Sequence, residues 1–383
     1  MRAKAIVLLC VISASMLLVG PAGALDDEPT DVAAVAPTPV PTTTPTPGDV
    51  PDLTPYRGLG AWVDMYNEGP WDDPARIVGR MKARGATTLF LETANWGLKR
   101  DMFRVRAIDR FIEAAHANDI DVVAWTVPSF VRLEHDYRRA RVAIEYETPN
   151  GERFDSFALD IEATEVRRIG ARNRRLLALS ERLRALVGPD YALGAIIPDP
   201  AGQRYWPEFP YAGVDRFYDV FLPMGYWTYR TRGYNNVLNY STANIRIIRR
   251  ETGDPKVPVN VIGGIADDSF GKENRAFVRA LRTNDAIGGG MYDLPLMYRK
   301  QWEDLAPLST TDPEGNRRSP KEGTQERSSP RQEAVAEVPA DRTGRSGTSR
   351  RERLQGRLFD LLKKAHAVRE KLNPPGPAGD PGR

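Results

Sequence analysis

The chain of 383 residues carries 54 basic and 51 acidic side chains, so its formal net charge is only +3. A charge this close to balance excludes the strongly basic surface typical of nucleic-acid-binding proteins and gives no indication of an acidic partner. With one cysteine and three histidines, the sequence offers few ligands for a metal and few residues for thiol or imidazole catalysis.

The N-terminus has the form of a secretory signal peptide. Arg2 and Lys4 precede an apolar run over 5–19, and Ala-Gly-Ala at 22–24 provides a small-residue cleavage site. We therefore expect residues 1–24 to be removed and the protein to be secreted or associated with the cell surface. An uncleaved anchor is the alternative, although the apolar run is short for a membrane span. Cleavage would also remove Cys10, so the mature chain would need no disulfide.

Residues 25–56 are rich in proline and threonine, most densely at 36–47. Such a segment cannot bury a core and favours an extended conformation. It predicts a linker, which is either a stalk that holds a domain away from a surface or a disordered leader.

From residue 57 to residue 308, apolar runs of strand length alternate with longer amphipathic segments, a pattern typical of a parallel βα array. The predicted strands lie at 58–64, 88–93, 122–127, 154–162, 192–197, 219–225, 257–262 and 286–292. Helices are expected at 73–84, 105–118, 134–147, 165–187, 237–251, 272–283 and 297–305. The segment 134–147 can also be irregular. A long aromatic loop follows the fifth strand.

Eight βα units in about 250 residues are the size of a (β/α)8 TIM barrel. An open, doubly wound α/β sheet is the alternative fold. It is disfavoured because no glycine-rich phosphate loop follows the first strand, where the chain reads Asp64-Met65-Tyr66-Asn67. We therefore predict an α/β fold with a TIM-barrel domain at 57–308.

Order is expected to fade beyond the barrel. Residues 309–350 are rich in Ser, Thr, Pro, Arg and Glu, which predicts a disordered linker, and the tail at 374–383 is similar. Between them, residues 351–373 predict an amphipathic helix with a basic polar face. Its apolar stripe consists of Leu354, Leu358, Leu361, Ala365, Val368 and Leu372. This helix can form a short coiled coil, dock on the barrel or a partner, or lie on an anionic membrane surface.

The sequence has few histidines that could act as a catalytic base or bind a metal. His116 is expected within a helix and His366 in the tail, which leaves His135 near a strand end, and no G-x-S-x-G elbow supplies a serine for a triad. We expect neither a metal nor a cofactor. Proton transfer and nucleophilic chemistry therefore fall to carboxylates and tyrosines.

Acidic and aromatic residues gather at the predicted C-terminal ends of the strands, where TIM-barrel enzymes have their active sites. Such a mouth suits sugar rings, whose C–H faces stack on aromatic side chains while their hydroxyl groups meet polar ones. Many of the aromatic residues are also expected to fill the barrel or its interface with the helices. The predicted substrate-binding residues are Glu92, Trp96, Trp125, Trp227, Tyr292 and Asp293.

The segment 154–162 carries the strongest functional signal. If it is a strand, its alternate side chains point to opposite faces. Phe157, Leu159 and Ile161 form an apolar face, and the other face carries Asp160 and Glu162 at the C-terminal end. Two adjacent carboxylates repel each other, so one of them should have a raised pKa, as a general acid requires.

This segment resembles the D-x-x-D-x-D-x-E signature of chitinase-type, family 18 glycoside hydrolases. Asp155 matches the first aspartate, Asp160 the last aspartate and Glu162 the glutamate. The departures from the signature are Ala158 for the middle aspartate, Ser156 for the usual glycine and Ile161 for the frequent tryptophan.

Two further segments are similar to motifs of the same family. Met224-Gly225-Tyr226-Trp227, on the sixth predicted strand, is similar to M-x-Y-D, and Gly290-Met291-Tyr292-Asp293, on the eighth, is similar to the G-x-M-x-W region. Together with the fourth strand, these matches make the domain at 57–308 resemble a diverged, glycoside-hydrolase-like barrel of bacterial secreted type.

The resemblance implies specific roles for four residues. Glu162 would be the general acid that protonates the glycosidic oxygen. Asp160 would orient a substrate N-acetyl group whose carbonyl attacks the anomeric carbon, Tyr226 would hydrogen-bond that group, and Tyr292 would floor the sugar subsite. In the family, the aspartate replaced by Ala158 shares a proton with the position of Asp160.

The expected function is therefore that of a secreted glycoside hydrolase acting on a polysaccharide, with an N-acetylated amino-sugar polymer of a cell envelope as the candidate substrate. A retaining scheme with a second carboxylate would draw on Glu92, Asp267 or Asp293. The alternative is a non-catalytic carbohydrate-binding barrel displayed at the cell surface, which the absence of an acid at position 158 favours. Neither function calls for a nucleic-acid partner.

Overall fold

The computed structural model describes residues 51–269 and 271–309, without the side chain of Asp267. The expected signal peptide, most of the linker at 25–56, and the linker, helix and tail expected after residue 309 lie outside these residues.

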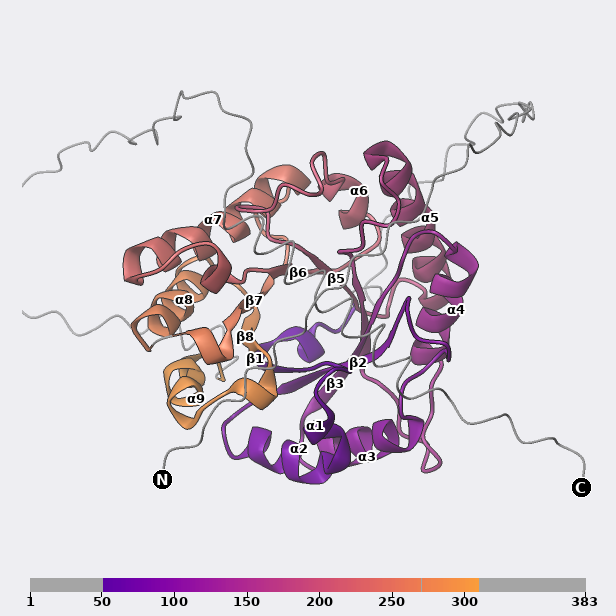
Figure 1. Cartoon of the computed structure of the whole chain (residues 1–383), viewed down its shortest axis with the longest axis horizontal. Coiled ribbons are helices and arrows are strands. Elements are labelled where there is room, and N and C mark those ends of the chain that lie inside the picture. Colours follow the sequence, from indigo (N-terminus) through magenta and orange to yellow (C-terminus); the bar gives the residue numbers. More distant parts are fainter. Residues whose placement is uncertain (1–50, 270, 310–383) are drawn as a thin grey trace, which may run out of the picture. The chain divides into compact units, whose positions relative to one another are not determined.

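Eight parallel strands close into a barrel in chain order, with the last strand pairing back onto the first (Figure 1). The strands are β1 (Gly58–Val63), β2 (Thr88–Asn95), β3 (Asp121–Val127), β4 (Ser156–Asp160), β5 (Leu193–Pro198), β6 (Val220–Met224), β7 (Asn260–Ile265) and β8 (Gly288–Tyr292). The predicted (β/α)8 TIM barrel is confirmed.

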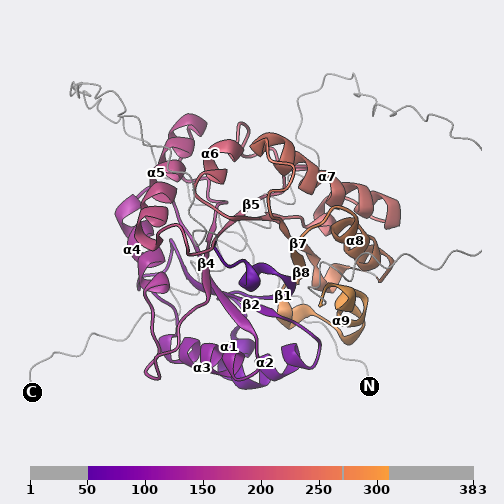
Figure 2. The ribbon, with the colours of Figure 1, turned by 180° about the vertical axis from the view of Figure 1, so that it is seen from behind.

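The α-helices surround the strands in both views of the ribbon (Figures 1 and 2). They are α1 (Glu68–Asp72), α2 (Pro74–Lys82), α3 (Val105–His116), α4 (Leu133–Ile144), α5 (Ile169–Val187), α6 (Tyr211–Asp215), α7 (Tyr234–Thr252), α8 (Gly271–Thr283) and α9 (Arg299–Leu305). The short 3-10 helices are η1 (Thr54–Tyr56), η2 (Trp227–Tyr229), η3 (Ala266–Asp268), η4 (Leu294–Leu296) and η5 (Ala306–Leu308). None of the helices within residues 51–269 and 271–309 has both the length and the apolar character that crossing a membrane requires.

Local sequence accounts for several of these boundaries. Helix α2 begins after Asp73, whose side chain accepts the backbone N–H of Arg76, and Pro74 occupies its first position, where no N–H is needed. Helix α7 ends at Gly253, which adopts a left-handed conformation with φ of 80°. Strand β7 begins at Asn260 rather than at the predicted residue 257, because Pro258 has no N–H to donate to a ladder.

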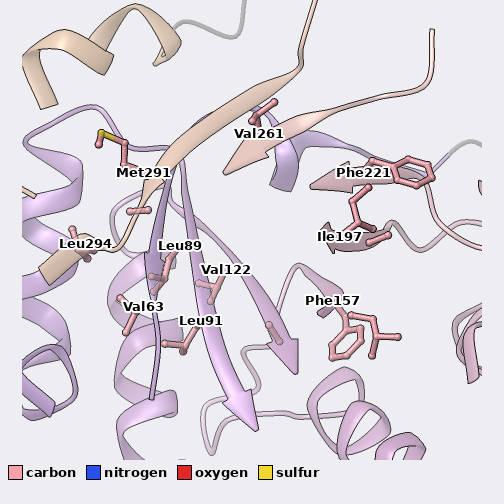
Figure 3. Close-up of a cluster of buried hydrophobic side chains, with 14 of the residues drawn as sticks. Val63, Leu89, Leu91, Val122, Phe157, Ile197, Phe221, Val261, Met291 and Leu294 are labelled. Atoms are coloured by element: carbon pink, nitrogen blue, oxygen red, sulfur yellow. The ribbon is translucent and has the colours of Figure 1, made fainter. Parts of the chain in front are cut away.

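The strands send alternate side chains into two separate apolar layers. The outer layer lies between the barrel and its helices, and Figure 3 shows one or more of its side chains on every strand, including Phe157 on β4 and Val261 on β7. The inner layer fills the barrel and includes Trp62, Phe90 and Trp125. Because β4 follows this period of two, its apolar and carboxylate faces lie as predicted.

The inside of the barrel is packed solid below its mouth. The ring of Trp62 stacks on that of Phe90, with centroids 4.2 Å apart. At the opposite, N-terminal end, Tyr56 is fully buried and donates its hydroxyl to the carbonyl of Phe157 at 2.9 Å, while Ser156 donates to the Tyr56 oxygen at 2.7 Å. The domain thus includes Tyr56, just before the predicted boundary at 57. Only the C-terminal end of the barrel remains for a substrate.

Candidate active site

Four carboxylates lie at the C-terminal ends of neighbouring strands. Asp64 follows β1, Glu92 lies near the end of β2, and Asp160 ends β4 with Glu162 two residues beyond it. Glu92 is completely buried, Asp160 and Asp64 are only 6 % and 8 % exposed, and Glu162 is half-buried. The structure therefore brings the predicted catalytic pair, Asp160 and Glu162, to the barrel mouth beside two further acids.

Asp160 has an unusual environment for a carboxylate. Its Oδ1 atom is buried and has no hydrogen-bond partner among the described residues. Burial raises the pKa of Asp160 well above its ordinary value, and the nearby charges of Glu162 and Glu92 raise it further. Leaving a buried acceptor unsatisfied costs about 1–3 kcal/mol, so this oxygen is suited to accept a donor from a ligand.

Glu92 is buried and accepts two hydrogen bonds. Its Oε2 accepts the backbone N–H of Met65 at 2.9 Å, and its Oε1 lies 3.4 Å from the side-chain nitrogen of Asn95. Burial, followed by the charge of Asp64, raises the pKa of Glu92 well above its ordinary value, although the two hydrogen bonds oppose the shift and Glu162 adds to it. Burial thus favours the protonated form of Glu92, and its two hydrogen bonds hold the side chain in place.

Two tyrosines lie at the same end of the barrel as these acids. Tyr226 and Tyr292, from the ends of β6 and β8, have ring centroids 5.7 Å apart, and Tyr292 donates its hydroxyl to Asp64 Oδ2 at 2.8 Å. Burial raises the pKa of both hydroxyls. The charges of Asp160 and Glu162 raise the pKa of Tyr226 further, and the charge of Asp64 raises that of Tyr292 further. Both side chains are therefore neutral hydrogen-bond donors at neutral pH.

Tyr66 was not among the predicted site residues. It follows β1 in the segment that packs over Asp64, and its hydroxyl accepts the side-chain N–H of Asn95 at 3.0 Å. Burial raises the pKa of Tyr66, and the charges of Glu92 and then Glu162 raise it further. Its place two residues after Asp64, at a strand end, was the sequence signal that could have identified it.

Three aromatic side chains at the mouth remain accessible to solvent. Tyr66 is 50 % exposed, Tyr205 43 % and Trp96 40 %, which makes them exceptions among the large apolar residues of a packed domain. They come from the segments after β1, β5 and β2. The C-terminal end of the barrel thus combines exposed aromatic faces with buried carboxylates.

The remaining predicted substrate-binding residues have different surroundings. Trp125 is 4 % exposed and lies inside the barrel beside Trp62, so it forms part of the floor. Asp293 is 4 % exposed and follows a cis peptide bond after Tyr292. The side chain of Asp267 lies outside the described residues.

Trp227 requires a correction. It was predicted to bind substrate, but it is fully buried in the outer layer, with its ring centroid 4.9 Å from that of Phe277 on α8. The glycines Gly263 and Gly264 on β7 make room for its indole, since an added Cβ at either would lie within 3 Å of it. The chain turns outward after Tyr226, and a sugar at the mouth cannot reach this ring.

Asp199 has a structural role at the rim. Arg230 binds it through two hydrogen bonds, Nε to Oδ2 at 2.9 Å and Nη2 to Oδ1 at 2.8 Å, and the Tyr240 hydroxyl donates to Oδ2 at 2.6 Å. This bidentate pair ties the segment after β5 to the segment after β6. Within residues 51–269 and 271–309, no group of three or more histidine, cysteine or acidic residues is arranged to hold a metal ion.

Asp155, which matches the first aspartate of the signature, lies at the other end of β4. It accepts the backbone N–H of Val122 at 2.6 Å and lies 3.1 Å from His116 Nε2, while Glu152 lies 2.5 Å from His116 Nδ1. The hydrogen bond to Asp155, opposed by partial burial and reinforced by Glu152, raises the pKa of His116 to about 9. This cluster stabilises the N-terminal end of the barrel and is remote from the mouth.

We expect His116 to make the stability of the domain dependent on pH. Because its folded pKa of about 9 exceeds the unfolded value of about 6.5, its contribution is fully present below pH 6.5 and is lost as the pH rises through 9. The contribution should be about 1 kcal/mol, since solvent screens the pair. Asp121, whose pKa burial raises to about 6, titrates below this window.

Chemical unfolding from pH 6 to pH 10 tests this expectation. His116→Gln should flatten the decline that the wild type shows above pH 6.5, whereas His135→Gln, on α4, should leave it in place. An unchanged decline in His116→Gln would contradict the assignment.

Comparisons with known proteins extend this description. No protein-family model and no curated protein sequence matches the chain. Among solved structures, the barrel is similar to the endo-β-1,4-mannanase of Thermotoga petrophila, with 10 % identity and a TM-score of 0.51 over 67 % of this chain and 76 % of that one. The endo-1,4-β-mannanase of Rhizomucor miehei matches with 8 % identity and a TM-score of 0.51 over 67 % and 95 % of the two chains.

A chitinase from Bacteroides thetaiotaomicron matches equally well, with 10 % identity and a TM-score of 0.51 over 67 % of this chain and 97 % of that one. At such low identity the likeness concerns the fold alone. The chain thus resembles, in its barrel, TIM-barrel glycoside hydrolases that include both a chitinase and mannanases.

Proposed function

We propose that this protein is a glycoside hydrolase that acts on a polysaccharide at the mouth of its barrel. The observation that carries the proposal is the pair formed by Asp160, the last residue of β4, and Glu162, two residues beyond it, with the Asp160 Oδ1 atom buried and unsatisfied. Tyr226 and Tyr292 lie at the same end of the barrel as neutral donors, and the exposed rings of Tyr66, Trp96 and Tyr205 follow strands that end there.

Glu162 is the general acid in this proposal. It is half-buried next to the buried carboxyl of Asp160, and mutual repulsion favours the retention of one proton by the pair. Glu162 delivers its proton to the glycosidic oxygen as the bond between that oxygen and the anomeric carbon breaks, so the leaving sugar departs as a neutral alcohol.

An N-acetylated amino-sugar polymer is the substrate that fits these groups. Asp160 Oδ1 can accept the N–H of the acetamido group, and the Tyr226 hydroxyl can donate to its carbonyl oxygen. The carbonyl oxygen so oriented attacks the anomeric carbon and forms a cyclic intermediate. The oxygen of a water molecule then attacks the anomeric carbon while Glu162 takes a proton from that water, and the bond between the anomeric carbon and the carbonyl oxygen breaks, which restores both the acetamido group and the acid. The substrate thereby supplies the nucleophile.

Glu92 and Asp64 are poorly placed to act as a nucleophile in place of the substrate. A conventional retaining enzyme needs an ionised carboxylate about 5 Å from the acid. Glu92 is poorly suited to that part, because burial raises its pKa and its oxygens already accept two hydrogen bonds. Asp64 is also occupied, since Tyr292 and the backbone of Tyr66 donate to it.

A non-catalytic carbohydrate-binding barrel is the second candidate, and Ala158 is the observation that favours it. This residue is fully buried and lacks the acid that the family signature has at the same place. Such a barrel would use the same aromatic rings to bind a glycan without cleaving it.

We also propose that the protein is exported, on the basis of the signal-peptide pattern at 1–24 and the linker at 25–56. In this proposal the segment 351–373, which the sequence predicts to form a basic amphipathic helix, docks on a partner or a membrane surface. Detection of the mature N-terminus after residue 24 in culture medium would support export, and retention of the uncleaved chain in the cytoplasm would contradict it.

Incubation of the full chain with a panel of soluble polysaccharides tests the function. We expect reducing ends to appear with an N-acetylated amino-sugar polymer and not with its fully de-N-acetylated form, because the latter has no carbonyl nucleophile. Binding of the acetylated polymer without any cleavage would favour the non-catalytic barrel, and cleavage of a mannan instead would refute the proposed substrate.

A further inference from the structure

One row of residues across the barrel wall links Glu92 to the position of the missing acid. In the register of the strands, Glu92 on β2 pairs with Trp125 on β3, and Trp125 pairs with Ala158 on β4. The alternation of each strand turns these three side chains into the barrel. Glu92 thus lies at the level of Ala158, two strand spacings or about 9.6 Å away along the wall.

The side chain between them explains why position 158 carries no acid. Trp125 and Ala158 belong to the same buried inner layer, and Ala158 is completely inaccessible to solvent. A carboxylate at 158 would point into apolar surroundings next to the indole. The small alanine leaves room for the large tryptophan.

Glu92 provides a buried carboxylate, which position 158 lacks. It is the only fully buried carboxylate within the described residues, and the backbone N–H of Met65 fixes one of its oxygens. Glu92 lies close enough for its charge to act on Asp160, since this charge contributes to the raised pKa of Asp160. Within the range that the structure describes, both charged groups that raise the pKa of Asp160, Glu162 and Glu92, are acids.

We propose that Glu92 takes the part of the absent acid at position 158, as a positioning residue that shares protons with Asp160 and Glu162 across the barrel mouth. The catalytic meaning of this inference rests on the proposed function. Three close carboxyl groups in a poorly solvated site cannot all ionise, so their protons leave in steps that belong to the group as a whole.

The proton balance of the proposed reaction follows from this sharing. Asp160 must be free to accept the N–H of the substrate while Glu162 keeps its proton for the leaving oxygen. A proton held on Glu92 allows both conditions at once, because both acidic neighbours of Asp160 are then neutral, whereas an ionised Glu92 would repel the Asp160 charge. No proton is lost or gained by Glu92 over the reaction cycle.

Chemical unfolding of four proteins from pH 5 to pH 8 tests the sharing without reference to activity. The proteins are the wild type, Glu92→Gln, Asp160→Asn and the double variant. Because burial raises the pKa of both groups, each should make the wild type lose stability as the pH rises, and each single variant should reduce that loss. The double variant should reduce it by less than the sum of the two single reductions, since their mutual repulsion is removed only once. Strictly additive reductions at every pH would overturn the inference.

The pH profile of kcat/KM supplies the catalytic test. Glu92→Gln keeps an oxygen that can accept the N–H of Met65, but it removes a group that can become negatively charged. The apparent pKa values that define the limbs of the kcat/KM profile should therefore fall by about half a unit or more. A residue with only a structural role would lower kcat/KM at every pH and leave the limbs in place, and that result would overturn the inference.

Asp136→Asn is the matched control. Asp136 is 3 % exposed and accepts the backbone N–H groups of Ser129 and Phe130, so it resembles Glu92 in burial and bonding. It is not among the charges that shift Asp160, and its replacement should lower stability without moving the limbs. If the wild type cleaves no glycan, the proposed function fails, while the unfolding measurements still decide whether Glu92 and Asp160 share protons.

Discussion

Replacement of Glu162 by glutamine is expected to lower kcat on a polysaccharide by about 10²–10⁴-fold, which is the usual contribution of a general acid. Glutamine has nearly the same shape but carries no proton that it can give to the leaving oxygen. Binding should change little, because the aromatic rings of Tyr66, Trp96 and Tyr205 remain in place. KM should therefore stay within about threefold of the wild-type value.

Glu165→Gln is the control for this substitution. Glu165 lies three residues further along the same segment, and its charge acts on Arg172 rather than on Asp160. It should cleave the polysaccharide at the wild-type rate. A Glu162→Gln variant with wild-type kcat would show that the proton comes from another residue.

Introduction of an aspartate at position 158 is expected to destabilise the domain by about 3–5 kcal/mol at neutral pH, because it buries a charge without a partner. Ala158 is fully inaccessible, and Trp125 lies across from it in the register of β3 and β4. The new carboxyl would have a raised pKa, so the loss of stability should be smallest at low pH and should grow as the pH rises through that pKa.

The isosteric Ala158→Asn separates volume from charge. It should cost stability through its size and its buried amide, but by an amount that does not change with pH. Denaturant titrations of both variants between pH 4 and pH 8 provide the comparison. An Ala158→Asp variant that is as stable as the wild type and more active would mean that the site has room for the family's acid and that Glu92 does not replace it.

The period of two on β4 was enough to predict the placement of the proposed catalytic pair. Phe157 and Leu159 lie in the outer layer, while Asp160 ends the strand at the barrel mouth, as the alternation of apolar and acidic residues required. Strand positions could be predicted for the same reason, since eight apolar runs separated by amphipathic segments leave few alternatives to a barrel. The differences are confined to strand ends, as at Pro258, where the loss of an N–H delays β7.

The direction of side chains beyond a strand could not be predicted in the same way. Trp227 follows β6 in a short 3-10 helix, where the period of two no longer holds, and it packs outward against Phe277. Tyr66 follows β1 in the same manner but remains at the mouth. Aromatic residues in such segments look alike in the sequence, because tertiary contacts decide their direction.

The relation between Glu92, Trp125 and Ala158 depends on register, which a sequence does not specify. Each strand can be recognised alone, but the pairing of Glu92 with Trp125 and of Trp125 with Ala158 is set by how the barrel closes. The burial of Glu92 depends on the same closure, since the segment after β1 covers it through Met65. The sequence therefore predicted an acid at this strand end but not its relation to Asp160.

The dependence of the rate on the leaving group is the most direct test of Glu162 as the general acid of a glycosidase. A strongly activated aryl leaving group departs without a proton, whereas a sugar hydroxyl needs one. In the first turnover, before Glu162 acts on water, Glu162→Gln should therefore release the aryl group of an activated aryl glycoside of the N-acetylated sugar within about tenfold of the wild-type rate, while its first-turnover cleavage of the polysaccharide is slower by about 10²–10⁴-fold. An equal loss on both substrates would contradict the assignment of Glu162.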